Sequence, residues 1–513
     1  MGSKKSLEDD SLLADVPREI ELKLAIDPEA IETLPRHPLL TRARRAPEQG
    51  GSLYAVYFDT EAQDLRRAGL SLRLRRQGNG WVQTIKADSG ARGAVMERDE
   101  WEAAVGGEAL DWRAVQGTAL GLLLETKDVK DRIRPAFTVT TDRQAYLLDR
   151  NRTRIELVLD RAEIAAGGRS QRFGEIELEV KRGKANAVFG VALDLVEAAP
   201  VRLSRSTKSG RGYALLDGLA PKPVKADRVA LDPGCPSAQA FQAIARSCLA
   251  QAVENEAIVR EHREADAVHQ FRVGLRRLRA AASLFGDLIS DAESRKVRDE
   301  LRWMNHSLGP IRDLDVLIAR LRAAPDHEQS LAAAQRRRDE ACGQLLARLD
   351  EPRFRRATLL AAAWIEAGRW LTLGDPALRE RRDEPVESRA ARELRKRRKR
   401  VLKRARRLEE LDPEARHQVR IEIKKLRYGV EFFGRLFSGA KAKSRRKRIL
   451  TATEQLQEIL GELNDLAVGG RLLAPAAAGS DGSSAEPEGL ADALLARARR
   501  IYDDLAGTKP FWN

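Results

Sequence analysis

The sequence predicts an α+β protein, in which an antiparallel sheet of about eight strands with added helices precedes an all-α region of two duplicated helical bundles. Three observations predict this class. From Pro17 to about Asp217 apolar and polar residues alternate with a period of two, whereas from about residue 237 nearly every window is helical and rich in Ala, Leu, Arg and Glu. Residues 219–236 between them form a Pro-rich linker. Within the helical part, a twelve-residue pattern recurs 148 positions further on.

The first half contains eight segments with strand character, and its turns include Gly78-Asn79-Gly80 and Gly167-Gly168. Helical patterns lie near residues 28–35, 61–68, 108–124 and 184–197. Eight antiparallel strands are a number that suits a barrel. The predicted strands are 19–26, 53–59, 70–76, 81–87, 95–102, 136–144, 152–162 and 173–181.

A chain of 513 residues is too long for one ordinary core, so two or more domains are expected. The predicted parts are a disordered N-terminus (1–15), a sheet domain (16–218), the linker (219–236) and a helical domain (237–513) with repeats at about 240–372 and 390–510. Residues 1–236 hold 38 Lys and Arg against 36 Asp and Glu, but residues 237–513 hold 54 against 41. The second part therefore carries a net charge of +13, which indicates an anionic partner.

Three cysteines, Cys235, Cys248 and Cys342, have no ligand spacing and predict neither a zinc site nor a disulfide framework. No apolar run approaches the roughly 18 residues that cross a bilayer. The first residues are not followed by the apolar stretch of a signal peptide. A cytoplasmic protein without a membrane partner is the expectation.

Several predicted strands stack like charges on one face. Glu19, Glu21 and Lys23 alternate with apolar residues, as do Glu175, Glu177 and Glu179; Arg73 and Arg75 share a face of another strand. Such faces are usually only solvated. Here acidic and basic strands are segregated, and stacked like charges repel unless something offsets them. If these faces point into a closed sheet, the carboxylates can hold Mg²⁺ or Mn²⁺ while Arg and Lys bind phosphate oxygens. No His lies among these strands to act as a general base.

At these residues the chain resembles the CYTH domains, or triphosphate tunnel metalloenzymes. Glu19-Ile20-Glu21-Leu22-Lys23 stands where that family has its Glu-x-Glu-x-Lys signature. Five further motifs follow in the family's order over about 200 residues: Tyr57-Phe58-Asp59-Thr60, Leu72-Arg73-Leu74-Arg75, Thr84-Ile85-Lys86, Gly174-Glu175-Ile176-Glu177-Leu178-Glu179 and Ser204-Arg205-Ser206-Thr207-Lys208.

The resemblance implies an eight-stranded antiparallel β-tunnel that binds a triphosphate with a divalent metal. It implies metal ligands at Glu19, Glu21, Asp160, Glu175, Glu177 and Glu179, and phosphate contacts at Lys23, Arg73, Arg75, Lys86, Arg143 and Lys208. Arg150, Arg152 and Arg154 lie close to Arg143 in the sequence and remain alternatives to it. The implied substrates are inorganic triphosphate, thiamine triphosphate, RNA 5′ ends, or ATP for a cyclase. Trp81 and Trp101 could stack on a ring, but strand tryptophans more often belong to a core.

The repeated helical pattern has a cationic face in both copies. His269, Arg272, Arg276 and Arg279 fall within about 80° of a helix, with apolar residues opposite. The second copy places His417, Arg420, Lys424 and Arg427 in the same way. The match extends to 308–314 and 460–466, at an offset of 152. The spacing of the histidines does not suit zinc, so each is interpreted as a phosphate hydrogen-bond donor.

These residues resemble the CHAD domain, a duplicated helical domain with the signature His-x-x-Arg-x-x-x-Arg-Arg/Lys-x-Arg. The resemblance covers about 270 residues and implies binding of inorganic polyphosphate. A tunnel fused to such helices favours inorganic triphosphate as the substrate. Nucleic acid is the competing polyanion for the basic run 395–407, but aromatic residues make up only 5% of the chain and none interleaves the basic arcs.

The expected function is metal-dependent hydrolysis of inorganic triphosphate to pyrophosphate and phosphate, together with polyphosphate binding by the helices. Such a protein could associate with polyphosphate granules in the cytoplasm. Three alternatives stay open: a non-catalytic polyphosphate-granule-binding protein, a thiamine triphosphatase and an adenylate cyclase.

Overall fold

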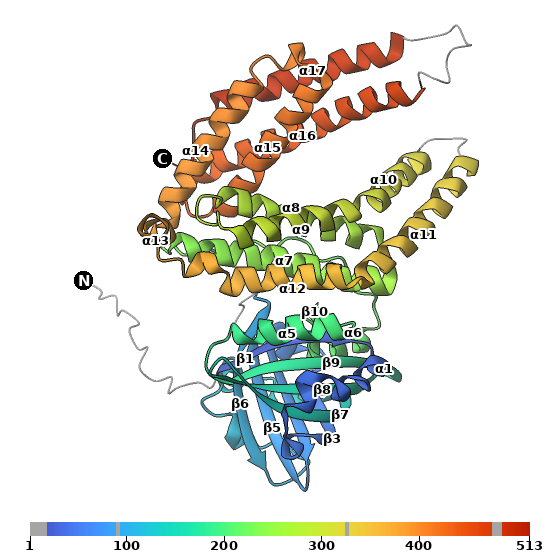
Figure 1. Ribbon diagram of the computed structural model, residues 1–513, viewed down its shortest axis with the longest axis vertical. Helices are drawn as coiled ribbons and strands as arrows, with labels where there is room; N and C mark the ends of the chain where they lie inside the picture. The colour runs from blue at the N-terminus through green and yellow to red at the C-terminus, as the bar shows by residue number, and fades with distance from the viewer. Residues whose placement is uncertain (1–17, 89–92, 324–327, 474–484, 513) are drawn as a thin grey trace. The chain divides into compact units, whose positions relative to one another are not determined.

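The computed structural model describes residues 18–88, 93–323, 328–473 and 485–512 (Figure 1). The predicted disordered N-terminus, 1–15, lies outside the described residues. The chain forms two compact units. The first contains Met1–Lys225, Leu249–Arg272 and Trp303–Ala367; the second contains Ala226–Cys248, Val273–Arg302 and Gly368–Asn513. The predicted domain boundaries remain a prediction, because these units interleave along the chain.

The first unit is built on one antiparallel sheet of ten strands. All eight predicted strands are present, and the alternation of apolar and polar residues that predicted them places one face of each strand in a core. The strands are β1 (Arg18–Ile26), β2 (Arg44–Arg45), β3 (Gly51–Asp59), β4 (Leu70–Gln77), β5 (Gly80–Asp88), β6 (Val95–Val105), β7 (Arg134–Arg150), β8 (Thr153–Ala166), β9 (Arg169–Arg182) and β10 (Arg202–Ser204).

The strand order is β10-β1-β6-β5-β4-β3-β7-β8-β9, and β1 also pairs with β9. Eight long strands therefore each have a hydrogen-bonded neighbour on both sides. The sheet is not closed along its whole length, because β1 pairs with β6 only up to Leu22 and then with the short β10. The expected α+β class, in which an antiparallel sheet precedes a helical region, is confirmed. The short strands β2 and β10 were not predicted, because two or three residues are too few to show a period.

Apolar residues form two clusters on opposite faces of the sheet: the first lies on the inner face, because Tyr57 is the register partner of Arg73 and points to the same side, and the second lies on the outer face. One gathers around Tyr57, Phe137 and Tyr213, with the Tyr57 and Phe137 rings stacked at 4.7 Å. The other contains Leu72, Leu74 and Ile85, with Trp81 and Trp101 packed against it. Both tryptophans therefore belong to a core, as expected from their place in strands. The second cluster makes the outer face of β4 and β5 apolar, so Arg73, Arg75 and Lys86 of these strands point to the inner face.

The helices of this part of the chain are α1 (Pro28–Ile31), α2 (Pro38–Thr41), α3 (Asp64–Arg67), α4 (Ala119–Thr126), α5 (Ala187–Ala198) and α6 (Lys208–Asp217). α6, which was not predicted, packs on β7, β8 and β9. It begins where the Thr207 hydroxyl accepts a hydrogen bond from the backbone N–H of Gly210, and it ends at Gly218, whose φ of 64° is left-handed. The buried side of α5 includes Val188, Val191 and Leu195.

The rest of the described chain is helical, as predicted. The helices are α7 (Ser237–His262), α8 (Ala265–Leu284), α9 (Ala292–Ser307), α10 (Gly309–Ala323), α11 (Glu328–Asp350), α12 (Pro352–Ala367), α13 (Pro376–Asp383), α14 (Val386–Arg404), α15 (Pro413–Phe433), α16 (Ala440–Leu473) and α17 (Ala485–Gly507). α8 and α15 carry the two copies of the repeated pattern. In the first unit α12 packs on α5, with Arg356 Nε 2.7 Å from Glu197 Oε1.

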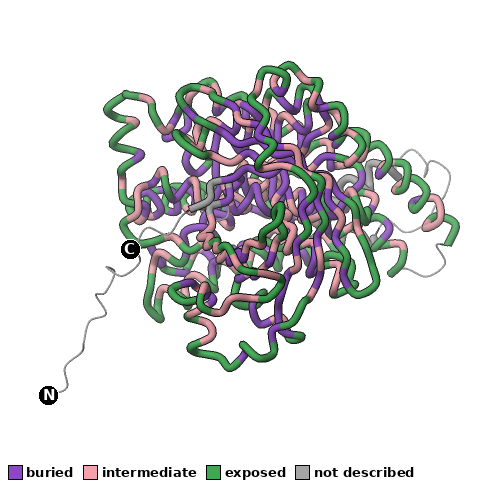
Figure 2. Tube along the Cα trace, turned by 90° about the horizontal axis from the view of Figure 1, so that it is seen from below, coloured by how far each residue is buried: buried purple, intermediate pink, exposed green. Residues whose placement is uncertain are grey.

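Within the second unit, α14 packs on α15, α15 on α16, and α16 on α17. The apolar stripes of these helices are buried, as in Leu394 of α14 and Leu426 of α15, and exposed residues line the turns (Figure 2). All three cysteines are free. None of the helices in the described ranges is long and apolar enough to cross a membrane.

Candidate functional site

The inner face of the sheet surrounds a cavity of 360 Å³ whose lining is almost entirely charged or polar. Residues two positions apart on one strand line it together, as Glu21 and Lys23 do on β1 and Arg73 and Arg75 on β4, because alternate side chains of a strand share a face. The cations of the lining are Lys23, Arg73, Arg75, Lys86, Arg98, Arg143, Lys181 and Lys208; the carboxylates are Glu21, Glu100, Glu102, Glu156, Glu177 and Glu179.

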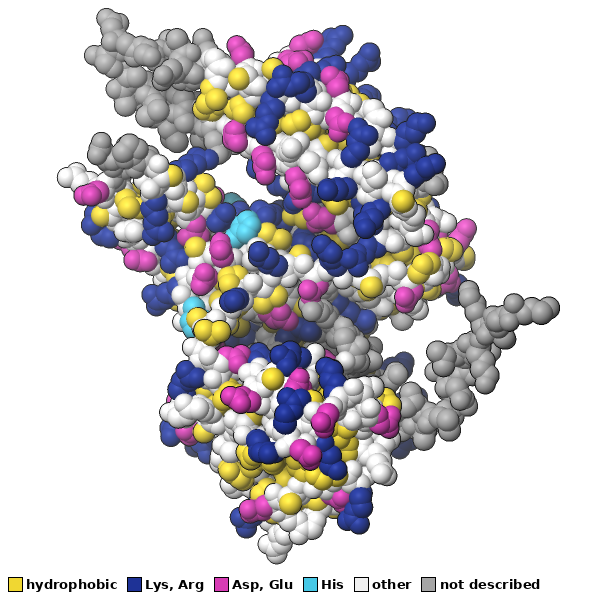
Figure 3. Space-filling view, turned by 180° about the vertical axis from the view of Figure 1, so that it is seen from behind, with side chains coloured by type: hydrophobic (Ala, Val, Ile, Leu, Met, Phe, Trp, Pro, Cys, Tyr) yellow, Lys and Arg dark blue, Asp and Glu magenta, His cyan; other side chains and the backbone are white. Residues whose placement is uncertain are grey.

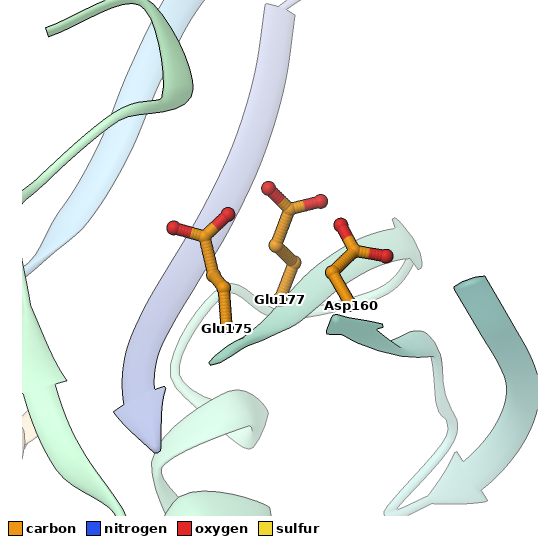
Figure 4. Close-up of side chains that lie close together, drawn as sticks. All are labelled: Asp160, Glu175 and Glu177. Carbon is orange, nitrogen blue, oxygen red and sulfur yellow. The ribbon is translucent and has the colours of Figure 1, made fainter. Parts of the chain in front are cut away.

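Three carboxylates gather at one wall of this cavity. Asp160 of β8 and Glu175 of β9 are register partners, and Glu177 lies two residues along β9. One oxygen of each lies within 4.8 Å of the others, and the close-up shows the three carboxylates directed toward the same space (Figure 4). Asp160 is fully buried and Glu175 is 2% exposed. Among the described residues, this is the group whose geometry could hold a metal ion.

Two lysines and one arginine neutralise the acidic cluster of Asp160, Glu175 and Glu177. Lys208 Nζ lies 2.6 Å from Glu175, 2.9 Å from Asp160 and 3.0 Å from Glu177. Lys23, the register partner of Glu177, contacts that carboxylate and lies 3.1 Å from Glu21. Arg143 donates hydrogen bonds to both oxygens of Asp160, at 2.7 and 2.6 Å, and to Glu177 at 3.0 Å. The cluster therefore holds positive groups in place at the cavity wall.

The pKa values follow from burial opposed by these charges. Burial alone would raise the pKa of Glu177, but Lys208, Lys23 and Arg143 hold it well below the usual value. Asp160 behaves in the same way: Lys208 and Arg143 overcome its burial and lower its pKa. At Glu175 burial dominates and raises the pKa. Despite their own burial, Lys23 and Lys208 have raised pKa values because of the carboxylates around them, so both stay charged.

The opposite wall is cationic, and two glutamates of β6 hold it. Lys86 Nζ lies 3.1 Å from Glu100, and Arg73 lies 3.8 Å from Glu100 and 3.7 Å from Glu102. Arg75 lies 3.6 Å from Glu102, which also accepts a hydrogen bond from the Thr84 hydroxyl at 3.0 Å. Crowding by Arg73, together with burial, lowers the pKa of Arg75 to about 10. Such a wall is a strong attractor for a further anion.

The structure brings together most of the predicted site residues. Lys23, Arg73, Arg75, Lys86, Arg143 and Lys208 all line the cavity, as do Glu21, Glu177 and Glu179. Asp160 and Glu175 lie in the acidic cluster. Glu179 lies 2.7 Å from Lys181, outside that cluster. Glu19 lies on β1, but its side chain is outside the described residues. Their roles remain predictions.

Arg143 is also distinguished from its three sequence neighbours. Arg150 and Arg152 line a different hollow, at the turn between β7 and β8, and Arg154 is paired with Asp149. The sequence did not single out Glu156, Lys181 and Thr207, which also line the cavity. It also did not predict that Glu100 and Glu102 lie close to the arginines of β4. The period of β6 placed its two glutamates on one face, but only the pairing β4-β5-β6 sets them beside Arg73 and Arg75.

In the helical part, the first arginine of each repeat contacts its own repeat. Arg272 Nη1 donates to the carbonyl oxygens of Leu308 (3.4 Å) and Gly309 (3.3 Å). In the second copy, Arg420 Nε donates to the carbonyl of Gln457 at 3.3 Å, and its guanidinium approaches Gly461 so closely that a Cβ there would lie 3.2 Å from Nη2. The recurrence of 308–314 and 460–466 is therefore explained in part by packing against these arginines.

The later cations of the two copies differ in their surroundings. Arg276 and Arg279 are half-buried, and within the described chain neither has a carboxylate partner. Burial, with Arg302 nearby, lowers the pKa of Arg279. By contrast, Arg427 lies 3.6 Å from both Glu431 and Glu454. His269, His417 and Lys424 are half-buried. Figure 3 shows Lys and Arg side chains gathered over the helical part on the face it displays.

Two domain families account for these two kinds of site. Residues 17–213 match the CYTH domain and residues 243–474 match the CHAD domain. The chain carries a CYTH domain and a CHAD domain. The CYTH match encloses every strand of the sheet, and the CHAD match encloses both copies of the repeated pattern. The sequence resemblances to both families are therefore confirmed.

Individual relatives fit the same families. An inorganic triphosphatase of Haemophilus influenzae is 27% identical over 203 residues, which cover 39% of this chain and 55% of that protein. The chain thus spans about half the length of this curated relative. A crystal structure of the CHAD domain from the plant Ricinus communis is 29% identical, covers 56% of this chain and 98% of that chain, and has a TM-score of 0.45. A Hippeastrum protein described as an adenylyl cyclase with dominant triphosphatase activity is 20% identical, covers 39% of this chain and 95% of that chain, and has a TM-score of 0.30.

The CYTH domain is related to an inorganic triphosphatase, which supports a triphosphatase-type enzyme at the level of the family. Its cavity also fits a metal ion on the chemistry of its donors. All the candidate ligands are carboxylates, which hard divalent cations prefer. In addition, Glu21 Oε1 is buried without a hydrogen-bond partner, so one further oxygen at the cavity lacks a positive or donor group.

Proposed function

We propose that the CYTH domain hydrolyses inorganic triphosphate to pyrophosphate and phosphate with the help of Mg²⁺ or Mn²⁺. The observation that supports this most is the cavity itself, in which eight cations surround a space that faces a buried carboxylate cluster. A small, highly charged anion can form ionic contacts with many of these cations at the same time. A larger organic substrate would require apolar lining, and here the lining is nearly all polar.

In this proposal Glu21, Asp160, Glu175 and Glu177 would hold the divalent ion, with Glu19 and Glu179 as the further predicted ligands. When bound, that ion supplies charge neutralisation at the phosphates and lowers the pKa of a water molecule. Arg73, Arg75 and Lys86 bind phosphate oxygens from the cationic wall and stabilise the charge that develops on the phosphoryl group. Lys23, Arg143 and Lys208 orient the triphosphate from the side of the acidic cluster.

The test is phosphate release by the purified full-length protein with Mg²⁺ or Mn²⁺, and then with EDTA. Inorganic triphosphate, ATP, thiamine triphosphate and long-chain polyphosphate are compared. We expect metal-dependent release that is fastest from inorganic triphosphate. Release that is fastest from thiamine triphosphate, or a cyclic product from ATP, would assign the cavity to one of the alternative substrates.

A site variant separates chemistry from folding. Glu21→Gln removes the carboxylate charge while it keeps the size of the side chain, so we expect hydrolysis to be abolished. Because the buried Lys23–Glu21 pair is also lost, the melting temperature is measured to show that the variant is folded. Glu48→Gln on an exposed 3₁₀ turn is the matched control. Equal activity of the two variants would refute a metal role for Glu21.

We also propose that the CHAD domain binds inorganic polyphosphate through the cationic faces of α8 and α15. The support is that Arg276 and Arg279 offer charge without a carboxylate partner among the described residues. The test is polyphosphate binding at two salt concentrations, with His269→Ala/Arg276→Ala compared with Glu21→Gln. We expect only the double variant to lose binding. If Glu21→Gln lost polyphosphate binding to the same extent, the tunnel would be the polyphosphate site.

The two activities could be coupled, so that the helices keep the enzyme on polyphosphate or supply short chains to it. Truncation in the 219–236 linker would remove α12, which packs on α5, and so would confuse coupling with folding. The double variant is the better test. Coupling predicts that it responds less than the unaltered protein when polyphosphate is added to the triphosphatase assay.

A further inference from the structure

A second basic hollow, with a volume of about 680 Å³, lies within the second unit, and neither repeated histidine is among its lining residues. One side is a face of α14 and the turn after it; the other is the segment 510–512 near the C-terminus. The lining consists of Arg395, Arg398, Lys399, Leu402, Lys403, Arg406, Pro510 and Trp512. Every charged residue of this lining is a cation.

Four of these cations are available to a ligand. Arg395, Lys399, Lys403 and Arg406 are exposed, and none of them has a carboxylate partner in the described parts of the chain. From Arg395 to Lys403 the stripe runs about 12 Å along the helix. Other cations of α14 are neutralised: Lys396 Nζ lies 3.3 Å from Glu393, and Arg404 Nη1 lies 3.9 Å from Glu422. Repulsion along the stripe is therefore not offset within the chain, and a bound anion would offset it.

Hydrogen bonds and aromatic packing hold the floor of the hollow in place. Arg398 Nη2 donates hydrogen bonds to the carbonyl oxygens of Leu505 (3.3 Å), Ala506 (2.9 Å) and Thr508 (2.9 Å), which fixes the chain after α17 against α14. Arg445 Nη1 donates to the carbonyl of Pro510 at 3.2 Å. Trp512 is 2% exposed and packs on Phe511 at 4.8 Å. Leu402 and Pro510, which are half-buried, thus form a fixed apolar surface beside the cations, and the buried Trp512 supports it.

We infer that this hollow binds a nucleoside polyphosphate such as ATP. Its phosphates would lie along Arg395, Lys399, Lys403 and Arg406, and its base against Leu402 and Pro510. An inorganic phosphate chain would satisfy the cations but leave the apolar floor uncovered, whereas a phosphate chain that ends in a flat ring uses both parts.

The site is distinct from the proposed polyphosphate faces. The cationic side chains of α15 are directed toward α16, since Arg420 contacts Gln457 and Arg427 lies near Glu454. The stripe of α14 instead adjoins the segment after α17, where the Tyr502 hydroxyl donates to the carbonyl of Leu402 at 2.9 Å. The inference therefore does not depend on the proposed function of either domain.

The test is calorimetric titration of ATP in EDTA into the full-length Arg73→Ala/Arg75→Ala protein, because this double variant weakens phosphate binding in the tunnel and leaves the hollow unaltered. We expect one equivalent of ATP to bind to it, and adenosine alone to bind far more weakly. Lys399→Glu should weaken ATP binding by about tenfold or more, which corresponds to about 1.4 kcal/mol. Arg400→Glu is the matched control, because Arg400 is the next residue of α14, is exposed and does not line the hollow.

Photo-cross-linking with azido-ATP locates the base. The label should fall on a peptide that contains Leu402 or residues 510–512. Absence of ATP binding to the Arg73→Ala/Arg75→Ala protein, a label confined to tunnel strands, or equal losses in the two charge-reversal variants would each overturn the inference. Displacement of ATP by a mixed-sequence oligonucleotide at a lower concentration than by ADP would also overturn it, in favour of nucleic acid. Loss of triphosphatase activity in Glu21→Gln has no bearing on it.

Discussion

Arg143 of β7 and Asp160 of β8 face each other in register, and the arginine donates to both carboxylate oxygens at 2.7 and 2.6 Å. Asp160 is fully buried, and its second partner is Lys208 Nζ at 2.9 Å. A bidentate pair of this kind fixes the guanidinium in orientation as well as in position. The carboxylate proposed as a metal ligand therefore also aims two of the cations proposed to bind phosphate.

Asp160→Asn should destabilise the CYTH domain, because it leaves Arg143 and Lys208 with fewer carboxylates in a buried site. Loss of one member of a buried pair costs about 3 kcal/mol or more. The measurement is the midpoint of urea unfolding, followed by the fluorescence of the CYTH tryptophans. Asp142→Asn is the control, since Asp142 pairs with Arg161 at 2.5 Å on the surface, and exposed pairs contribute about 1 kcal/mol or less. Equal shifts for the two variants would contradict the buried pairing.

The acid stability of the domain should depend on Glu177. Lys208, Lys23 and Arg143 overcome its burial and lower its pKa below that of the unfolded chain, so its stabilising contribution is present above the unfolded pKa and is lost as the pH falls. Unfolded glutamate has a pKa of about 4.3, so the loss should begin below about pH 5. Glu177→Gln should unfold at a lower temperature at neutral pH and show a smaller fall in melting temperature between neutral and acid pH. An unchanged slope would show that Glu177 is not the responsible group.

The sequence could predict the sheet, because the alternation that identifies a strand also determines which side chains share a face. It therefore placed Glu21 with Lys23 and Arg73 with Arg75 correctly on the inner face. It could not predict which strands are neighbours. The closeness of Asp160 to Glu175, and of Glu102 to Arg75, depends on pairing between strands and is not a property of any one segment.

One helix and one set of ion-pair partners could also not be predicted, for physical reasons. The first turns of α6 contain Ser209, Gly210 and Gly212, which are poor helix formers; its Thr207 cap was the one available signal. In the helices, the repeated pattern identified the cationic faces, but the partners of Arg427 come from a later turn of α15 and from α16. The repeated pattern therefore predicts equal roles for two copies whose cations are neutralised by carboxylates to different extents.

Glu102→Gln should impair turnover more than binding. Glu102 lies 3.7 Å from Arg73 and 3.6 Å from Arg75 and accepts from Thr84, so it positions the two guanidiniums without needing to touch the substrate. In the variant both guanidiniums are still present, but a negative charge that partly neutralises them is lost. We therefore expect kcat for triphosphate to fall by about tenfold, since misplacement of positioning groups is costly, and KM to stay the same or fall.

The control for Glu102 is Glu163→Gln, which alters an exposed glutamate 3.2 Å from Arg172 at the surface. It should leave both constants unchanged. A rise in KM with unchanged kcat in Glu102→Gln would indicate that the residue serves ground-state binding, and the positioning role would be wrong.

The two copies of the repeat should contribute unequally to polyphosphate binding. Arg279 has no carboxylate partner among the described residues, whereas Arg427 lies 3.6 Å from both Glu431 and Glu454 and is already partly neutralised. Arg279→Ala should thus weaken binding of long-chain polyphosphate more than Arg427→Ala, and should lower its dependence on salt more. The measurement is affinity at two or more ionic strengths for both variants. Glu454→Gln provides the converse: it should strengthen binding through Arg427, because it removes a competing anion. If Arg427→Ala proved the more harmful change, the ligand would displace the glutamates at little cost, and the static pairing would not determine which copy dominates.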